Sequence, residues 1–226
     1  MTAQISIVIP TLNAEDSLAD CLSALIEGLM AGLIRELIIS DGGSTDKTAV
    51  IADEAGAVLI HGPASRGGQL RRGAAVARSD WLLVVHADTV LAPGWADAVA
   101  AHLKHGQGPA CFRLKFRAQG LAPNIVAGWA NLRTSLFDLP YGDQGLLVPR
   151  KLYDAAGGYP DQPLMEDVAL VRALKPRPVL LPSIALTSAE RYIRAGWLRR
   201  GARNLWTLMR YFSGADPQSL DRHYRR

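Results

Sequence analysis

Short apolar runs alternate with longer amphipathic stretches from residue 5 to residue 87, and this alternation constrains the fold more than any other feature of the sequence. Each run has the length and composition of a buried strand, and the stretches between them carry apolar residues at helical spacing. Such alternation predicts a Rossmann-like α/β fold, with a mostly parallel central sheet flanked by helices on both faces. The expected strands are ISIVIP (5–10), ELIIS (36–40), AVLIHG (57–62) and WLLVVHA (81–87).

Polar residues follow these runs at the points where the strands end. The carboxyl ends of parallel strands meet at one edge of a sheet, and ligands bind beyond that edge. The polar residues are therefore expected to converge on one site. They are Thr11 and Asn13 after the first strand, Asp41 after the second, and His86 and Asp88 after the fourth.

The turn DGGSTDKT, which begins at Asp41, has two interpretations. The Asp41 carboxylate could accept a hydrogen bond from a nucleotide base while the glycines let the ligand approach the main chain. Alternatively, the turn only leads into a helix that is capped by Ser44 or Thr45. Asn13 is expected to cap the helix that follows the first strand. The turn lacks the lysine of a phosphate-binding loop, and no G-x-G-x-x-G follows the first strand, which disfavours NTPase and dinucleotide sites.

Asp88 lies where a buried strand is expected to meet the ligand edge. A carboxylate there could hold Mg²⁺ or Mn²⁺ and leave coordination positions open for phosphate oxygens. It could equally cap the turn before Pro93. His86 could be a ligand, a base or a histidine that is satisfied within the protein.

Charged residues at two further places are candidates for chemistry. Arg66, favoured over Arg71 and Arg72, could bind phosphate through its planar guanidinium, or it could lie on a solvated helix face. Glu166 and Asp167 begin an expected helix, where carboxylates are favoured electrostatically. One of these two could instead be a general base for an attacking hydroxyl.

The second half of the chain has a less regular pattern. Its C-terminal segment, at about 195–213, mixes tryptophans and leucines with four arginines. As a basic amphipathic helix it could lie on an anionic membrane, or it could pack its apolar side on the domain and leave the arginines in water. The other expected elements are strands at 110–118 and 145–150 and helices at 124–137 and 166–175.

Composition limits the class of protein. The 226 residues, 49% hydrophobic and 20% charged, fit one domain spanning 1–226. The formal charge of +4 is compatible with an anionic substrate or membrane, whereas the absence of aromatic-interleaved basic patterns places nucleic acid last. No run is long enough to span a bilayer and no signal peptide precedes the first strand, so we expect a cytoplasmic protein. Cys21 and Cys111 are expected to be buried free thiols.

Taken in order, several stretches resemble glycosyltransferase family 2, whose members have the GT-A fold. They are VIPTLNAEDSL, IISDGGSTDKT, SRGGQLRRGA, HADT at the place of the family's Asp-x-Asp metal motif, and MEDV. The resemblance runs from about Ile5 to about Arg191. It implies an inverting glycosyltransferase that moves one sugar from a nucleotide-diphosphate sugar to the hydroxyl of a small-molecule or lipid-linked acceptor.

The resemblance also implies roles for individual residues. Asp88 would bind Mg²⁺ or Mn²⁺, and Asp167 would be the base, with Glu166 as the second candidate. Asp143 and Gln144 in YGDQG would lie near the acceptor. The residues around the nucleotide would be Pro10, Thr11, Asn13, Asp41, Arg66 and His86, with Arg191 closing over the diphosphate.

Two departures from the family pattern are visible. His86 replaces the first aspartate of Asp-x-Asp, which removes one anionic contact. The Gln-x-x-Arg-Trp motif of processive members is missing, which favours a single transfer. A narrower subgroup, often described as arsenosugar-biosynthesis glycosyltransferases, is similar in sharing HAD, YGDQG and LTSAERY.

Two other classes of protein are compatible with the sequence. A nucleotidyltransferase shares the sheet and the metal but usually has a glycine-rich loop with lysine or arginine after the first strand, where this chain has TLNAEDS. The other is a non-catalytic nucleotide-sugar binder or a protein peripheral to the membrane, which His86 and the basic C-terminal segment favour. The donor, the acceptor and the oligomeric state are not fixed by the sequence.

Overall fold

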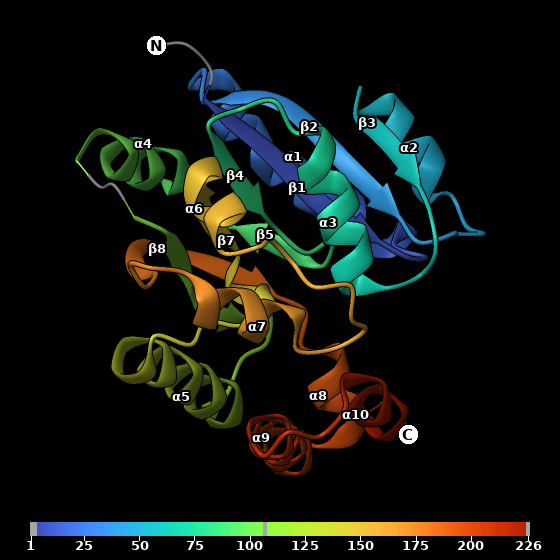
Figure 1. Ribbon diagram of the computed structural model, residues 1–226, viewed down its shortest axis with the longest axis vertical. Helices are drawn as coiled ribbons and strands as arrows, with labels where there is room; N and C mark the ends of the chain where they lie inside the picture. Colours follow the sequence, from blue (N-terminus) through green and yellow to red (C-terminus); the bar gives the residue numbers. More distant parts are fainter. Residues whose placement is uncertain (1–3, 106–107, 225–226) are drawn as a thin grey trace.

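The strands of the chain hydrogen-bond into one eight-stranded sheet with helices on both faces (Figure 1). The structure, a computed structural model, describes residues 4–105 and 108–224. The order across the sheet is β3-β2-β1-β4-β7-β6-β8-β5. The strands are β1 (Ile5–Thr11), β2 (Ile34–Asp41), β3 (Val58–His61), β4 (Trp81–Val84), β5 (Thr89–Leu91), β6 (Ala110–Phe116), β7 (Leu146–Pro149) and β8 (Val179–Thr187).

The expected parallel arrangement is confirmed for the first half of the chain. β1 pairs in parallel with β2 and β4, and β2 pairs in parallel with β3. β7 then joins antiparallel to β4 and β6, while β6 and β8 are parallel to each other. The helices are α1 (Glu15–Met30), α2 (Thr48–Glu54), α3 (Arg66–Val76), α4 (Trp95–His105), α5 (Leu121–Phe137), α6 (Arg150–Ala155), α7 (Glu166–Ala173), α8 (Glu190–Ala195), α9 (Trp197–Phe212) and α10 (Pro217–Tyr224), with the 3-10 turn η1 (Gly142–Gln144).

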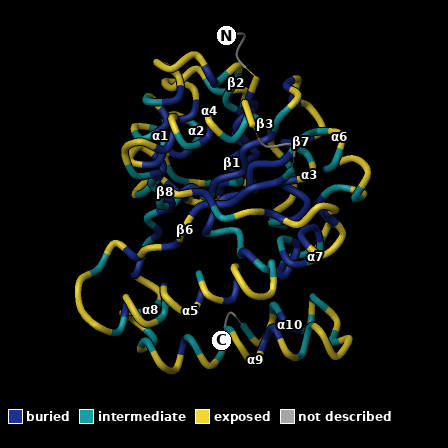
Figure 2. The backbone as a smooth tube through the Cα atoms, turned by 90° about the vertical axis from the view of Figure 1, so that its left-hand side faces the viewer, coloured by how far each residue is buried: buried dark blue, intermediate teal, exposed yellow. Residues whose placement is uncertain are grey.

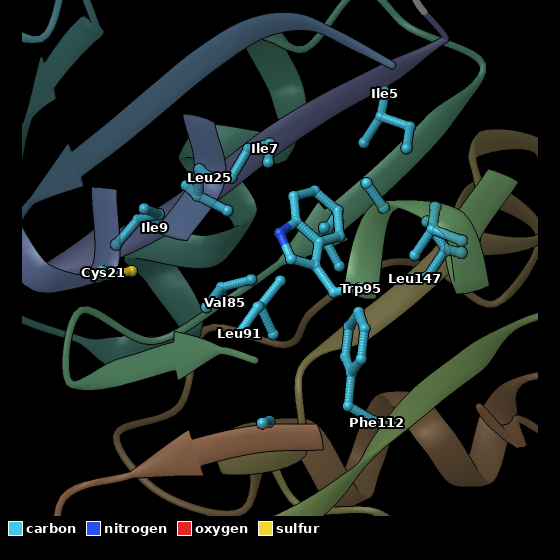
Figure 3. Close-up of a cluster of buried hydrophobic side chains, with 14 of the residues drawn as sticks. Ile5, Ile7, Ile9, Cys21, Leu25, Val85, Leu91, Trp95, Phe112 and Leu147 are labelled. Carbon is cyan, nitrogen blue, oxygen red and sulfur yellow. The ribbon is translucent and has the colours of Figure 1, made fainter. Parts of the chain in front are cut away.

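Alternate residues of β1 face two separate cores. Ile5, Ile7 and Ile9 pack with α1, α2 and α4 on one face of the sheet, and Val8 packs with α3, α6 and α7 on the other. Trp95 of α4 is 0% exposed, and its indole N–H donates to the Ala24 carbonyl at 2.9 Å (Figure 3). The period of two along a strand and the burial of both faces explain why these runs are almost wholly apolar. Both cysteines are buried and free, as expected.

Two parts of the sheet differ from the sequence expectation. The fourth strand ends at Val84 rather than at residue 87, so the HAD segment forms a connection between β4 and β5. No strand was expected from the sequence at 179–187, where β8 lies. Pro182 lies in an irregularity of β8, because pairing passes from Cys111–Leu180 to Arg113–Ile184. A proline is tolerated in such a bulge since its missing N–H is not needed there.

The expected helix caps are corrected by the structure. Asn13 has a positive φ of 49° and does not cap α1. Instead, the Thr48 hydroxyl accepts from the Ala14 N–H and the Asp46 carboxylate accepts from the Glu15 N–H. Ser44 and Thr45 likewise do not cap α2, because Asp46 accepts from the Thr48 N–H. The two helix starts therefore cap each other through side chains that are distant in sequence.

We predict that Gly67→Ala destabilises the fold by about 1–3 kcal/mol, because a methyl group there would overpack a contact between backbones. A Cβ at Gly67 would lie 2.0 Å from the Pro160 carbonyl oxygen, so the first turn of α3 would have to move away from the 160–162 segment. The measurement is urea unfolding. Gly128→Ala in α5 is the matched control, because a Cβ there meets nothing within 4 Å and alanine favours a helix. Equal stability of the two variants would contradict the prediction.

The C-terminal segment forms α9, in which Leu208 and Trp197 pack inward while most of the other large apolar side chains are exposed. Leu198 is 88% exposed and Trp206 60% exposed, whereas Arg200 is 8% exposed and lies over the Tyr224 ring. The expected inward apolar packing is therefore present only in part, since Leu208 is buried while several other apolar side chains of α9 stay in solvent. Among the described residues, no helix is long and apolar enough to cross a membrane.

Candidate functional site

The ends of β1 and β2 are tied together around Asp41. This carboxylate is 1% exposed and accepts four hydrogen bonds, from the hydroxyls of Thr11 and Ser44 and from the N–H groups of Gly43 and Ser44. Burial favours the neutral acid, but the hydrogen bonds from Ser44, Gly43 and Thr11 outweigh it and lower the pKa of Asp41 below its ordinary value. Asp41 thus holds the Gly42–Ser44 turn in place as a carboxylate.

The Asn13 loop is fastened to the same turn. The Asn13 N–H donates to the Ser44 hydroxyl at 2.8 Å, and the Asn13 side-chain oxygen accepts from the Thr45 N–H at 2.9 Å. Pro10 is half-buried at the end of β1, and Asn13 is exposed beside the turn. The expected nucleotide residues of β1 and β2 therefore lie together at one edge, where Asn13 is accessible and both Thr11 and Asp41 are buried.

His86 and Asp88 lie in the connection between β4 and β5 and reach the same edge of the sheet. Both side chains are half-buried. Burial, together with the positive charges of Arg66 and Arg191, holds the pKa of His86 well below its ordinary value, so the imidazole is neutral. The His86 Nε2 atom is buried and has no hydrogen-bond partner among the described residues. Arg66 and Arg191, although distant in sequence, therefore both act on this histidine.

The η1 turn closes on His86. A Cβ at Gly142 would lie 2.5 Å from the His86 ring and 3.5 Å from Asp167 Oδ2, so only glycine fits between them. The Gly142 N–H donates to Asp167 Oδ2 at 2.6 Å. This bond joins the start of α7 to the segment that faces the HAD connection. The predicted base and the predicted metal segment thus both lie beside one glycine.

Glu166 and Asp167 point in different directions, as two adjacent carboxylates on a helix must. Asp167 is half-exposed beside Gly142, whereas Glu166 is 1% exposed, and Glu166 Oε1 lies 3.7 Å from the Arg66 guanidinium. Neither carboxyl oxygen of Glu166 has a hydrogen-bond partner among the described residues. The structure corrects the expectation for Glu166, because a buried side chain cannot meet an incoming hydroxyl. Asp167 is the accessible carboxylate of the pair.

Burial is also the main influence on the charge of Glu166. It raises the pKa of Glu166 to about 8, with the Asp167 carboxylate adding to the rise and Arg66 opposing it. A carboxyl whose pKa is higher in the folded than in the unfolded chain makes the folded state bind more protons between the two values. The contribution of Glu166 to the free energy of unfolding therefore falls as pH rises from about 4.5 to about 8.

We predict that Glu166→Gln removes this part of the pH dependence, because glutamine keeps the shape and cannot ionise. The variant's free energy of unfolding, relative to wild type, should rise across that pH range by on the order of a few kcal/mol. Urea unfolding below and above the range measures the difference. Glu54→Gln, on an exposed glutamate, is the control and should show no such trend. A constant difference between Glu166→Gln and wild type at all pH values would contradict the raised pKa.

Asp143 lies in the same cluster of charges. Burial, reinforced by the Asp167 and Asp88 carboxylates and opposed by Arg133, raises the pKa of Asp143 to about 6. Its Oδ1 atom is buried without a hydrogen-bond partner among the described residues. An unpaired carboxyl oxygen beside two other carboxylates is suited to a hydroxyl donor or a cation.

Gln144 does not face the site. It is 0% exposed, and its side-chain oxygen accepts from the Thr134 hydroxyl at 2.8 Å while its N–H donates to the Phe112 carbonyl at 3.1 Å. Arg133 lies beside it, with its guanidinium 3.4 Å from the centre of the Tyr141 ring. The expectation that Gln144 contacts an acceptor is corrected, since its amide is used to hold the Tyr141–Gly145 segment against β6 and α5.

Two residues at this edge were missed by the sequence analysis. Gln69 of α3 is 5% exposed and donates to the carbonyls of Thr11 and Ser40, which bridges the ends of β1 and β2. His61 ends β3 and places its Nδ1 3.7 Å from Asp41 Oδ2. The signal for His61 was its place at the end of a predicted strand, level with Asp41. Gln69 gave no signal, because a glutamine on a helix is ordinarily solvated.

The comparisons with known proteins bear on the family. The model of the family described as glycosyl transferase family 2 matches residues 6–136. A curated relative, glucosyl-3-phosphoglycerate synthase of Mycolicibacterium paratuberculosis, is 34% identical over 95 residues, which is 38% of this chain and 29% of that protein. The chain spans less than a third of the length of the curated relatives it matches.

Solved structures share the fold. Glucosyl-3-phosphoglycerate synthase from Mycobacterium tuberculosis, solved in complex with Mn²⁺, UDP and glucosyl-3-phosphoglycerate, superposes with a TM-score of 0.57 at 22% identity, over 89% of this chain and 78% of that one. S. aureus TarS 1-349 superposes with a TM-score of 0.60 at 13% identity, over 98% of this chain and 69% of that one. These likenesses confirm the GT-A fold.

Proposed function

The chain belongs to glycosyl transferase family 2, and on that premise we propose that it transfers one sugar from a nucleoside-diphosphate sugar to an acceptor hydroxyl, with inversion at the anomeric carbon. One observation carries the proposal. Asp167, the only accessible carboxylate at the start of α7, meets His86 across Gly142 and so lies at the edge that carries Asp88. A base and a diphosphate site on one edge are what such a transfer requires.

The donor nucleotide, in this proposal, binds along the ends of β1 and β2. Asn13 and the backbone of the Gly42–Ser44 turn face the base and ribose, while Asp41 and Thr11 act by holding that turn. Arg66 and Arg191 provide positive charge for the diphosphate. Relatives of this fold were solved with UDP, which supports UDP as the first donor base to test, before GDP and dTDP.

Asp88 is proposed to hold Mg²⁺ or Mn²⁺ at this edge. Among the described residues no group of three or more His, Cys, Asp or Glu could hold a metal ion unaided. Half-buried Asp88 offers carboxylate oxygens at this edge, which fits an ion whose other ligands are phosphate oxygens of the nucleotide and water. Bound there, the ion would supply positive charge to the departing diphosphate.

Asp167 is proposed to remove the proton of the attacking hydroxyl. A new bond forms from that oxygen to the anomeric carbon as the bond from the carbon to the diphosphate oxygen breaks on the opposite face. The Gly142 N–H fixes the Asp167 carboxylate by donating to Oδ2, and this orientation leaves the group beside His86. The missing processive motif supports one transfer rather than polymerisation.

The alternatives gain no support. A nucleotidyltransferase would need a basic glycine-rich loop after β1, and residues 12–15 are instead fastened to the β2 turn. A non-catalytic binder would have no need of the Asp167 orientation. Membership in the narrower subgroup suggested by HAD and YGDQG stays a prediction, because the comparisons bear on the family as a whole.

The test is turnover. The protein is incubated with UDP-, GDP- and dTDP-sugars, Mn²⁺ and a panel of hydroxyl acceptors that includes phosphoglycerate, which a relative binds. Released nucleotide is quantified, and the anomeric configuration of any product is read by NMR. We expect release that depends on one acceptor and a product of inverted configuration. Nucleotide binding without release above the uncatalysed background, across the panel, would favour the non-catalytic binder.

A further inference from the structure

Helix α5 exposes an apolar stripe along its whole length. Its only charged residue, Arg133, is buried. The exposed positions recur at the spacing of one helix face, and the large side chains on them are between 48% and 81% exposed. They are Leu121, Ile125, Trp129, Leu132, Leu136 and Phe137.

Helix α9 presents a second stripe of the same kind. Its exposed large side chains are Leu198, Leu205, Trp206, Met209 and Phe212, between 44% and 88% exposed. α5 and α9 pack against each other at the end of the molecule opposite the N-terminus, and exposed residues run along both in Figure 2. We call these eleven side chains the apolar face. At roughly 100 Å² for a half-exposed aromatic side chain, the face exceeds the few hundred Å² that a monomeric protein usually leaves in water.

Positive charge lies beside the apolar face, in α8 to α10 and at the ends of α5 and α9. Residues 190–224, which contain α8, α9 and α10, carry seven arginines against three carboxylates. Arg194 and Arg199 are exposed. A pocket of about 290 Å³ opens where α5 and α9 end, lined by Phe137, Asp138, Leu139, Arg172, Arg177 and Phe212. Two guanidinium groups therefore stand beside two exposed phenylalanines.

We propose that the apolar face docks on an anionic lipid membrane, with α5 and α9 lying in the plane of the interface. Tryptophan and leucine side chains would enter the acyl boundary while the surrounding arginines contact lipid phosphates. A second copy of this chain is the rival occupant. It is disfavoured because both copies would bring the same arginine-rich rim together. This docking is independent of the transferase activity, and its test uses no donor.

The experiment is co-sedimentation of the full chain with vesicles of phosphatidylcholine alone and of phosphatidylcholine with phosphatidylglycerol, at low and high salt. Wild type should bind the anionic vesicles at low salt and lose most of that binding at high salt. Leu198→Glu and Trp129→Glu should each lower the partition coefficient between vesicles and water by about tenfold or more, because the glutamate cannot be buried in the acyl boundary as the apolar side chain is. Met30→Glu is the matched control, because Met30 is 82% exposed on α1 outside the apolar face.

Circular dichroism confirms that each variant is folded before its binding is compared. Absence of binding to anionic vesicles would overturn the proposal, and so would equal binding by Leu198→Glu, Trp129→Glu and Met30→Glu. Equal binding to vesicles without phosphatidylglycerol would overturn the selectivity for anionic lipid. If the protein does not bind vesicles but forms a dimer that Leu198→Glu dissociates, the apolar face is assigned to a second copy instead.

Discussion

Replacing Asp167 with asparagine should lower the rate of sugar transfer by about 10²–10⁴-fold, the usual contribution of a positioned general base. Asparagine has nearly the same shape, and its side-chain oxygen can keep the hydrogen bond from the Gly142 N–H. What it loses is the ability to take a proton from the acceptor. Affinity for the donor nucleotide should stay close to that of wild type, because Asp167 acts on the acceptor side.

The measurement compares single-turnover transfer rates with nucleotide affinities for the same preparations. Asp20→Asn, on an exposed aspartate of α1, is the control and should transfer at the wild-type rate. Glu166→Gln separates the two carboxylates of the pair, because only Asp167 is accessible. If Asp167→Asn transfers sugar at the wild-type rate, Asp167 is not the general base that takes the acceptor proton.

The second large effect is expected for Asp88. Asp88→Ala should lower transfer by about 10²-fold or more and should abolish the dependence of the rate on Mn²⁺, since a bound metal supplies several kcal/mol to a departing diphosphate. Asp97→Ala, on an exposed aspartate in the first turn of α4, is the matched control. The assay is the transfer rate over a range of Mn²⁺ concentrations. Full activity of Asp88→Ala with unchanged Mn²⁺ dependence would show that the metal binds elsewhere.

The parallel half of the sheet and its ligand edge were predictable because each strand carries a strong local signal. β1 and β2 each contain a short apolar stretch that is followed by polar residues, and their parallel register places Thr11 beside Asp41. The convergence of Asp167 on this edge was predictable only through the family resemblance. Nothing local places the start of α7 beside a loop more than seventy residues earlier.

The corrections have a common cause in contacts between distant segments. Asn13 could cap α1 by its sequence position, but Thr48 at the start of α2 and Asp46 in the turn before it satisfy those N–H groups instead. Gln144 is polar and follows a turn, yet partners from α5 and β6 bury it. β8 contains Pro182, and a proline ordinarily argues against a strand, but a bulge in β8 accommodates it. The orientation of α9 was not predictable for the same reason, because a hydrophobic stripe in the sequence does not show which other segment covers it.

The pH dependence of stability and the catalytic prediction test different groups at the same place. Glu166 is predicted to affect the pH dependence of stability because it is buried with a raised pKa. Asp167 is predicted to affect the rate of sugar transfer because it is accessible. Their separation explains why two adjacent carboxylates can have unrelated effects.

The central claim is that the HAD connection and the β1–β2 edge together bind a nucleoside diphosphate through a metal held by Asp88. Calorimetric titration with UDP, GDP and dTDP, each with and without Mn²⁺, on wild type and Asp88→Ala tests it most directly. The account predicts that one nucleotide binds wild type only with Mn²⁺ and that Asp88→Ala weakens this binding by about tenfold or more. Absence of binding by any nucleotide to the folded wild-type chain, or equal binding by Asp88→Ala, would contradict it.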